Sequence, residues 1–338
     1  MMFGVLLSVA LSMVLTIVVV RLGRFCCEKQ LWSIYGLSAL LSSAAGLMVQ
    51  KVLPRWLALP EDRRSLDNGL GMIRETWQAW LMPQFGDQWL MGVMAIMFVS
   101  SLLLGMFAKS FRTVVGGVVV GAILLGLGCW MFQKMLVGSM YFASSASTTS
   151  KFAYVVVPSL TLCLPWLGQW QWNRRATQVG IRATGEGQET VHDSHIYLLS
   201  VLALTLSGTL LLATSGTLSL ALQLLVFSAL PVAWMVEACL PHRKRSRPLP
   251  LFAARTFAGW LTASAGLLVV LGHLFAEVSL GLACLYAISL WWVPWLWPSN
   301  KASTIQKWGM ALLAAAPALI AAGIAAGIAA GTMVAAHG

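Results

Sequence analysis

The sequence predicts an all-α integral membrane protein: a polytopic bundle of about ten transmembrane helices, with one further interfacial helix on the outer surface. Of its 338 residues, 59% are hydrophobic and only 10% are charged. Soluble domains carry about 25% charged residues, so this chain has too few charges to cover a water-exposed surface. No long polar stretch interrupts the apolar runs, and residues 1–338 therefore form a single transmembrane domain in this interpretation.

The individual spans follow from the thickness of the bilayer, because about 20 apolar residues in a helix cross about 30 Å of hydrocarbon. The apolar runs are continuous and show no strict alternation with polar residues, which predicts helices and not the strands of a barrel. The ten predicted spans are residues 3–20, 31–50, 88–108, 113–133, 152–172, 195–213, 218–239, 252–272, 278–297 and 308–334.

The distribution of basic residues predicts the orientation. If the N-terminus is outside, fifteen of the 22 Lys and Arg residues fall in or beside the inner loops and seven on the outer side. Lys and Arg are enriched in cytoplasmic loops, so both the N- and C-termini are predicted to be outside. The tight loops favour a bacterial inner (cytoplasmic) membrane. The predicted inner loops are 21–30, 109–112, 173–194, 240–251 and 298–307.

The stretch HRKRSR at 242–247 is the most strongly basic part of the chain. Basic runs can bind nucleic acid or act as nuclear addresses, but here both flanks enter the bilayer within a few residues, so no nucleic-acid partner is expected. The net charge of +11 belongs to a membrane surface in this interpretation. Four side chains are predicted to bind anionic lipid headgroups at the cytoplasmic face: Arg243, Lys244, Arg245 and Arg247.

The longest predicted outer loop, 51–87, contains a helical pattern in its second half. Leu70, Ile73, Trp77 and Leu81 recur at the spacing of one helix face, which predicts a short helix lying on the outer surface. The alternative is a lid or a docking surface for an extracytoplasmic partner.

Glycine spacing points to close helix contacts. Gly323, Gly327 and Gly331 lie on one face of the last span, and small residues at this spacing let two helix backbones approach closely in lipid. The predicted contact is either internal or with another subunit. The span 113–133 is built similarly, with glycines at Gly116, Gly117, Gly121, Gly126 and Gly128.

Polar side chains near the ends of spans are candidates for buried charges or for a transport path, because an ionisable group at membrane depth is costly and is functional by default. The candidates are Gln133, Lys134, Glu237, His273 and Glu277. The ionisable ones are also close enough to an interface to extend toward water. If its helix continues beyond residue 133, however, Lys134 needs a partner, and Glu277 or His273 are the nearest on that side.

The sequence offers little for catalysis. The spans contain no Asp, and the four Asp residues are scattered over two loops, so no site for a magnesium-bound diphosphate is predicted. No His pair faces across the membrane to hold haem, and no CxxC or HExxH spacing indicates a metal site. We therefore expect no catalytic residue, no metal and no cofactor, and the pattern argues against an enzyme.

Two functions fit the sequence. The first is a transporter or permease for a small solute or lipid. Its possible halves, residues 1–172 and 195–338, are joined by the polar cytoplasmic loop 173–194, and five spans in each would make them inverted repeats. The two halves share no sequence similarity, however. The alternative is a non-catalytic membrane-embedded subunit or scaffold of a larger multisubunit complex, with other membrane subunits as partners; that role needs no buried polar chemistry.

Overall fold

The described part of the chain is entirely helical. The computed structural model describes residues 2–26, 31–49, 99, 114–136, 147–178, 187–240, 252–275, 277–293 and 303–337. These residues form nine α-helices and no strand. The helices are α1 (Met2–Cys26), α2 (Leu31–Val49), α6 (Val114–Leu136), α7 (Thr148–Gln178), α8 (Gly187–Thr214), α9 (Leu218–Cys239), α10 (Phe252–Phe275), α11 (Leu280–Trp292) and α12 (Thr304–His337).

Six of the described helices are long and apolar enough to cross a membrane, by length and composition: α1, α6, α7, α8, α9 and α12. The other three contain shorter apolar segments, at Ile34–Leu47, Gly259–Phe275 and Leu280–Trp292. The all-helical prediction is confirmed for the described residues, but the count of about ten spans is not. The predicted span 88–108, apart from residue 99, and the predicted outer helix within 51–87 lie outside the described residues.

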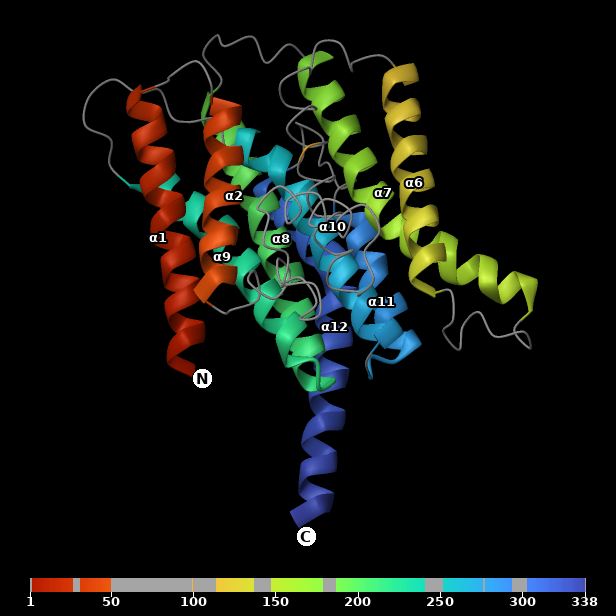
Figure 1. Ribbon diagram of the computed structural model, residues 1–338. Coiled ribbons are helices and arrows are strands. Elements are labelled where there is room, and N and C mark those ends of the chain that lie inside the picture. The colour runs from red at the N-terminus through yellow and green to blue at the C-terminus, as the bar shows by residue number, and fades with distance from the viewer. Residues whose placement is uncertain are drawn as a thin grey trace, which may run out of the picture.

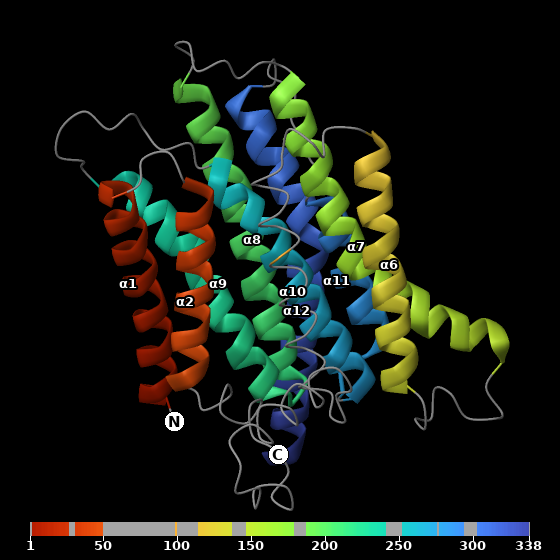
Figure 2. The ribbon, with the colours of Figure 1, turned by 45° about the horizontal axis from the view of Figure 1, so that its top comes forward.

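The helices run up and down through one bundle, and consecutive described helices run in opposite directions except for α2 and α6 (Figures 1 and 2). The start of α1 and the end of α12 lie at the same end of this bundle, which we call the terminal end. α1, α7, α9 and α11 run from the terminal end towards the opposite end, and α2, α6, α8, α10 and α12 run back. This alternation agrees with termini on one side of a membrane, while the choice of side stays a prediction.

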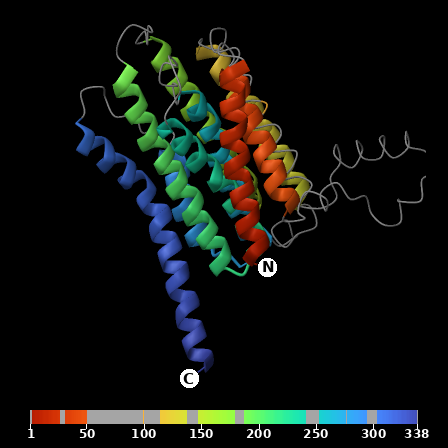
Figure 3. The same ribbon diagram turned by 90° about the vertical axis from the view of Figure 1, so that its left-hand side faces the viewer.

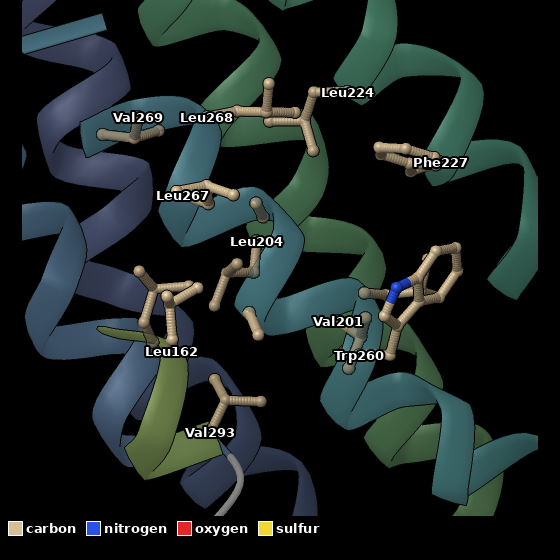
Figure 4. Packing of buried hydrophobic residues seen from close by; sticks show 14 of the residues in the cluster. Leu162, Val201, Leu204, Leu224, Phe227, Trp260, Leu267, Leu268, Val269 and Val293 are labelled. Carbon is tan, nitrogen blue, oxygen red and sulfur yellow. The ribbon is translucent and has the colours of Figure 1, made fainter. Parts of the chain in front are cut away.

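The core lies around α10, which contacts α2, α7, α8, α9 and α11. Leu162 of α7, Leu204 of α8 and Leu224 of α9 contribute to one buried apolar cluster with Leu267 and Leu268 of α10 (Figure 4). Since lipid is as apolar as leucine, such a core is held by close packing and hydrogen bonds more than by exclusion of water.

The outer helices expose large apolar side chains on the surface of the bundle. Soluble proteins rarely expose contiguous apolar patches of this kind, whereas lipid-facing helices are apolar on their outer side. Exposed examples on α1 and α6 are Leu6, Leu7, Val14, Leu22, Val118, Val119, Ile123 and Trp130. These surfaces fit contact with lipid chains.

Several helices extend beyond their predicted spans, and α7 and α8 do so into the same predicted loop. α7 continues to Gln178 and α8 begins at Gly187, so both ends of the predicted polar loop 173–194 are helical. Polar residues end an apolar span but do not end a helix, which usually needs a Gly, a Pro or a capping residue. At its other end α7 begins at such a residue, since the Ser150 backbone N–H donates to Ser147 Oγ at 3.1 Å.

Candidate functional site

Four of the predicted polar candidates lie at the terminal end of the bundle. Gln133 and Lys134 are exposed in the last turn of α6, and Glu277 is exposed between α10 and α11. His273 Nδ1 is 2.8 Å from the backbone oxygen of Val278; a carbonyl only accepts, so Nδ1 carries the hydrogen. His273 therefore stabilises the turn between α10 and α11.

The ion pair that a buried Lys134 would need is not formed. Within the residues that the structure describes, Lys134 pairs with neither Glu277 nor His273. The ring of His273 instead stacks on that of Tyr154 from α7, with centroids 6.4 Å apart and an interplanar angle of 14°. The structure places Lys134 on an exposed helix end, where an ammonium group can reach headgroups or water.

Glu237 differs from the other candidates because it is completely buried, with 0% of its surface exposed. It lies in the last turn of α9, whose backbone ends where the Leu240 N–H donates to Glu237 O at 3.2 Å. The expectation that this carboxylate extends to an aqueous interface is therefore wrong. A helix C-terminus carries partial negative charge. Both the burial and the helix end therefore disfavour a carboxylate at this position.

A seam of buried hydroxyl groups joins α1 to α2. Ser12 Oγ donates to the backbone oxygen of Ser42 at 2.8 Å, and Thr16 Oγ1 lies 2.8 Å from Ser42 Oγ. Gly46 extends the seam, since a Cβ there would overlap Ser12 Oγ and the side chain of Val226 from α9. Such interhelical hydrogen bonds between small residues are a principal source of helix association in lipid.

The seam continues to α9 and towards Glu237. Trp234 Nε1 donates to Ser38 Oγ at 3.4 Å, and the rings of Trp234 and Tyr35 meet edge to face with centroids 6.0 Å apart. Glu237 lies three residues beyond Trp234, on a neighbouring part of the same helix surface. The buried carboxylate thus belongs to a helix that polar side chains hold against α1 and α2.

A second group of polar contacts lies where proline interrupts α12. Pro317 has no N–H and its ring clashes with the preceding turn, so it bends a helix; α12 is visibly bent (Figure 3). The next N–H, that of Ala318, donates to Ser289 Oγ of α11 at 2.9 Å. Ser289 is completely buried, so this hydroxyl satisfies a backbone group inside the bundle.

Proline also interrupts α7, which contains Pro158 and Pro165. The first part of α7 points away from the bundle before the helix turns along it (Figures 1 and 2). Broken helices at membrane depth are tolerated where neighbouring helices or hydroxyl side chains satisfy the freed backbone groups. α7 and α12 both contact α11, so two interrupted helices flank this short helix.

Among the described residues, none packs against the predicted glycine face of α12. Gly323, Gly327 and Gly331 are exposed, and a Cβ added at any of them would meet nothing within 4 Å. The alternative, a contact with another subunit, stays a prediction. The headgroup candidates Arg243, Lys244, Arg245 and Arg247 lie outside the described residues, so their role also stays a prediction. Among the described side chains, no three of His, Cys, Asp and Glu are grouped to hold a metal ion.

Sequence reasoning missed the hydroxyl seam and a buried lysine. The seam has a detectable signature, since Ser8, Ser12 and Thr16 recur every four residues in the first span, as do Ser38, Ser42 and Gly46 in the second. Lys307, assigned from the sequence to an inner loop, is only 8% exposed in α12. A reciprocal capping box starts this helix earlier than predicted: Ser303 N donates to Gln306 Oε1 at 2.9 Å and Gln306 N to Ser303 Oγ at 3.3 Å.

The long apolar helices, their lipid-compatible surfaces and the buried polar seam indicate an α-helical, multi-pass membrane protein. Comparison with protein-family models, with curated proteins and with solved structures finds no match for this chain. The function must therefore be argued from the chain's own residues.

Proposed function

We propose that this protein is a membrane transporter for a small solute, and that transport depends on the buried carboxylate of Glu237. The single observation that carries the proposal is the complete burial of Glu237. Ionisable side chains within membrane helices are rare, and one that is buried by packing marks a functional site by default. A scaffold protein gains nothing from such a group, whereas a transporter uses it to bind a solute or a coupling ion.

The interrupted helices support the same function. Transporters build their sites from discontinuous helices whose segments can move against one another. Prolines lie inside both α7 and α12, and the Ser289 hydroxyl accepts from the backbone N–H next to Pro317. These contacts lie between helices inside the bundle, which favours a small solute over a lipid.

The proposal includes an orientation. The terminal end faces the outside, and the opposite end, where Glu237 lies, faces the cytoplasm of a bacterium. The fifteen basic residues of the predicted inner loops support this choice, because the cytoplasmic face is enriched in Lys and Arg. On that face Arg243, Lys244, Arg245 and Arg247 bind anionic headgroups.

The test is uptake by purified protein in liposomes. A panel of radiolabelled amino acids, sugars, polyols and amides is offered to the wild type, Glu237→Gln and Glu277→Gln. We expect the wild type to accumulate one class, and Glu237→Gln to lower uptake about ten-fold or more, equivalent to about 1.4 kcal/mol or more. Glu277→Gln removes an exposed carboxylate and serves as the matched control. No uptake of any class by the wild type, or equal uptake by Glu237→Gln, would contradict the proposal.

A second function, as a subunit of a larger membrane complex, is favoured by α12 alone. Its 34 residues span about 51 Å, well beyond the ~30 Å of the hydrocarbon core. Its exposed Gly323, Gly327 and Gly331 form a smooth face that a second helix fits. Native mass spectrometry in mild detergent separates the two functions: a lone chain favours transport, and co-purified subunits favour the complex.

A further inference from the structure

The interface between α9 and α10 contains two buried polar side chains at one level. Phe227 of α9 and Trp260 of α10 meet edge to face there, with ring centroids 5.5 Å apart and an interplanar angle of 67°. Figure 4 shows both rings in the core. The two helices run in opposite directions (Figure 2). One turn before Phe227 is Gln223, and one turn after Trp260 is Ser264, so the two polar residues lie level with each other.

Neither side chain is satisfied by the fold. Gln223 is 4% exposed and Ser264 is 2% exposed, and Gln223 Oε1 and Ser264 Oγ have no hydrogen-bond partner among the described residues. Other hydroxyls nearby do bond to their own helix, as when Ser228 Oγ donates to Leu225 O at 2.7 Å. Buried polar atoms in native proteins are nearly always paired, and an orphaned one inside a membrane bundle calls for an occupant.

A third polar group lies close to this level. Tyr286 of α11 donates from its hydroxyl to the backbone oxygen of Leu204 at 2.8 Å, which leaves its own oxygen able to accept. A Cβ added at Gly208 would lie 2.5 Å from this hydroxyl oxygen and 2.8 Å from Leu224, the residue after Gln223. The glycine therefore lets the tyrosine hydroxyl reach α8 beside α9.

In the helices that contact α9 and α10, charged residues occur only towards the helix ends: Arg21 and Arg24 in α1, Lys151, Arg174 and Arg175 in α7, and Glu189 and Asp193 in α8. α2 and α11, which both contact α10, contain no charged residue. Along α9 the nearest charge is Glu237, fourteen residues or about 21 Å of helix rise from Gln223. Along α10, Arg255 and His273 are each nine residues, or about 14 Å, from Ser264. An ion at this depth needs a compensating charge, so the chemistry suits a neutral molecule.

We propose that Gln223 and Ser264 form a binding site for a small uncharged solute that carries N–H or O–H groups, such as a polyol or a primary amide. The carbonyl oxygen of Gln223 accepts a hydrogen bond from the solute, and the Ser264 hydroxyl accepts or donates a second. The apolar side chains of Phe227, Trp260 and Leu224 border the site and exclude larger polar molecules. This assignment of a substrate class rests on the proposed transport function.

Binding is measured first, without transport, by scintillation proximity on purified protein with radiolabelled acetamide and glycerol. The variants are Gln223→Met and Ser264→Ala, and Ser219→Ala, at an exposed position in the first turn of α9, is the matched control. Loss of one hydrogen bond is expected to weaken binding about 3- to 10-fold in each site variant. An excess of unlabelled acetamide should displace the label, whereas N,N-dimethylacetamide, which has no donor, should not.

Thermal unfolding of the same samples checks the fold. Gln223→Met removes an unsatisfied group, so it should keep or raise the Tm of the solute-free protein, by about 2–4 °C at most. A fall in Tm would mean that the amide is satisfied within the fold and would overturn the site. Absence of binding by the wild type, or equal binding by both site variants, would overturn it as well.

Uptake by the same variants in liposomes separates the two proposals. If binding requires Gln223 but no uptake is seen, the proposed site is supported and the proposed transport function is contradicted. If uptake requires Glu237 but not Gln223, the transport function is supported and the proposed site is contradicted. Loss of uptake in Gln223→Met and Ser264→Ala, with Ser219→Ala unchanged, is the expected result.

Discussion

Two helices carry glycines at similar spacing, yet the structure uses them differently. On α6, Gly117 and Gly121 face α7: a Cβ at Gly117 would overlap the ring of Trp170, and one at Gly121 would lie 2.7 Å from Leu167. Cys163 Sγ of α7 is 3.3 Å from the backbone oxygen of Gly121. Small residues on α6 therefore allow a close helix contact, as the spacing predicts.

On α12 the packed face is made of alanine. Ala314, Ala318, Ala321 and Ala325 are buried at the spacing of one helix face, and they pack where α12 contacts α8 and α11. The three glycines lie on the opposite side of this helix. Glycine spacing thus predicts a smooth helix face, but not what covers it; in α12 the less conspicuous alanines form the internal contact.

The largest expected effect comes from the same substitution at one position on each face. Gly117→Leu places a branched side chain against Trp170, and overpacking of this kind costs about 3 kcal/mol or more when a ring must move. Gly327→Leu meets open space and should leave the Tm of the monomer unchanged. Thermal unfolding in detergent measures the Tm of both variants. Equal decreases in Tm would contradict the difference proposed between the two helices.

An intermediate effect is expected where α11 holds α12. Ser289→Ala removes the hydroxyl that accepts from the buried Ala318 N–H beside Pro317 and should lower stability by about 1–2 kcal/mol. In the Pro317→Ala background the helix has no proline bend, so this N–H depends less on Ser289 and the loss should shrink to about 0.5 kcal/mol or less. A double-mutant cycle by thermal unfolding checks this, and additive losses would mean that the hydroxyl and the proline act independently.

The sequence predicts the helices well because long apolar runs have few alternatives in lipid. It predicts their ends less well, since α7 and α8 continue through polar residues such as Arg174 and Asp193. Which charged side chain near a span end is buried depends on the helix that packs against it, and the position of the residue within its own helix does not contain that information. Glu237 and Lys134 both lie near predicted span ends, yet the first is buried and the second exposed.

The candidate site, too, could be predicted from the sequence only in part. The hydroxyl seam of α1 and α2 could be predicted from the four-residue spacing of Ser8, Ser12 and Thr16, because small polar residues on one face indicate a helix contact. The position of Gln223 level with Ser264 could not, since the two are 41 positions apart in the sequence and their levels are set by the packing of α9 on α10.

The proposed function requires a bundle that spans a membrane with its terminal end outside. Ser147→Cys and Ser246→Cys, each in a chain whose natural cysteines are replaced, are exposed in intact cells to a membrane-impermeant maleimide. Ser147 caps the start of α7 near the terminal end and is exposed, whereas Ser246 belongs to the basic stretch of the predicted inner loop 240–251. We expect labelling at Ser147→Cys in intact cells and at Ser246→Cys only after permeabilisation. The reverse pattern, or equal labelling of both in intact cells, would contradict this orientation.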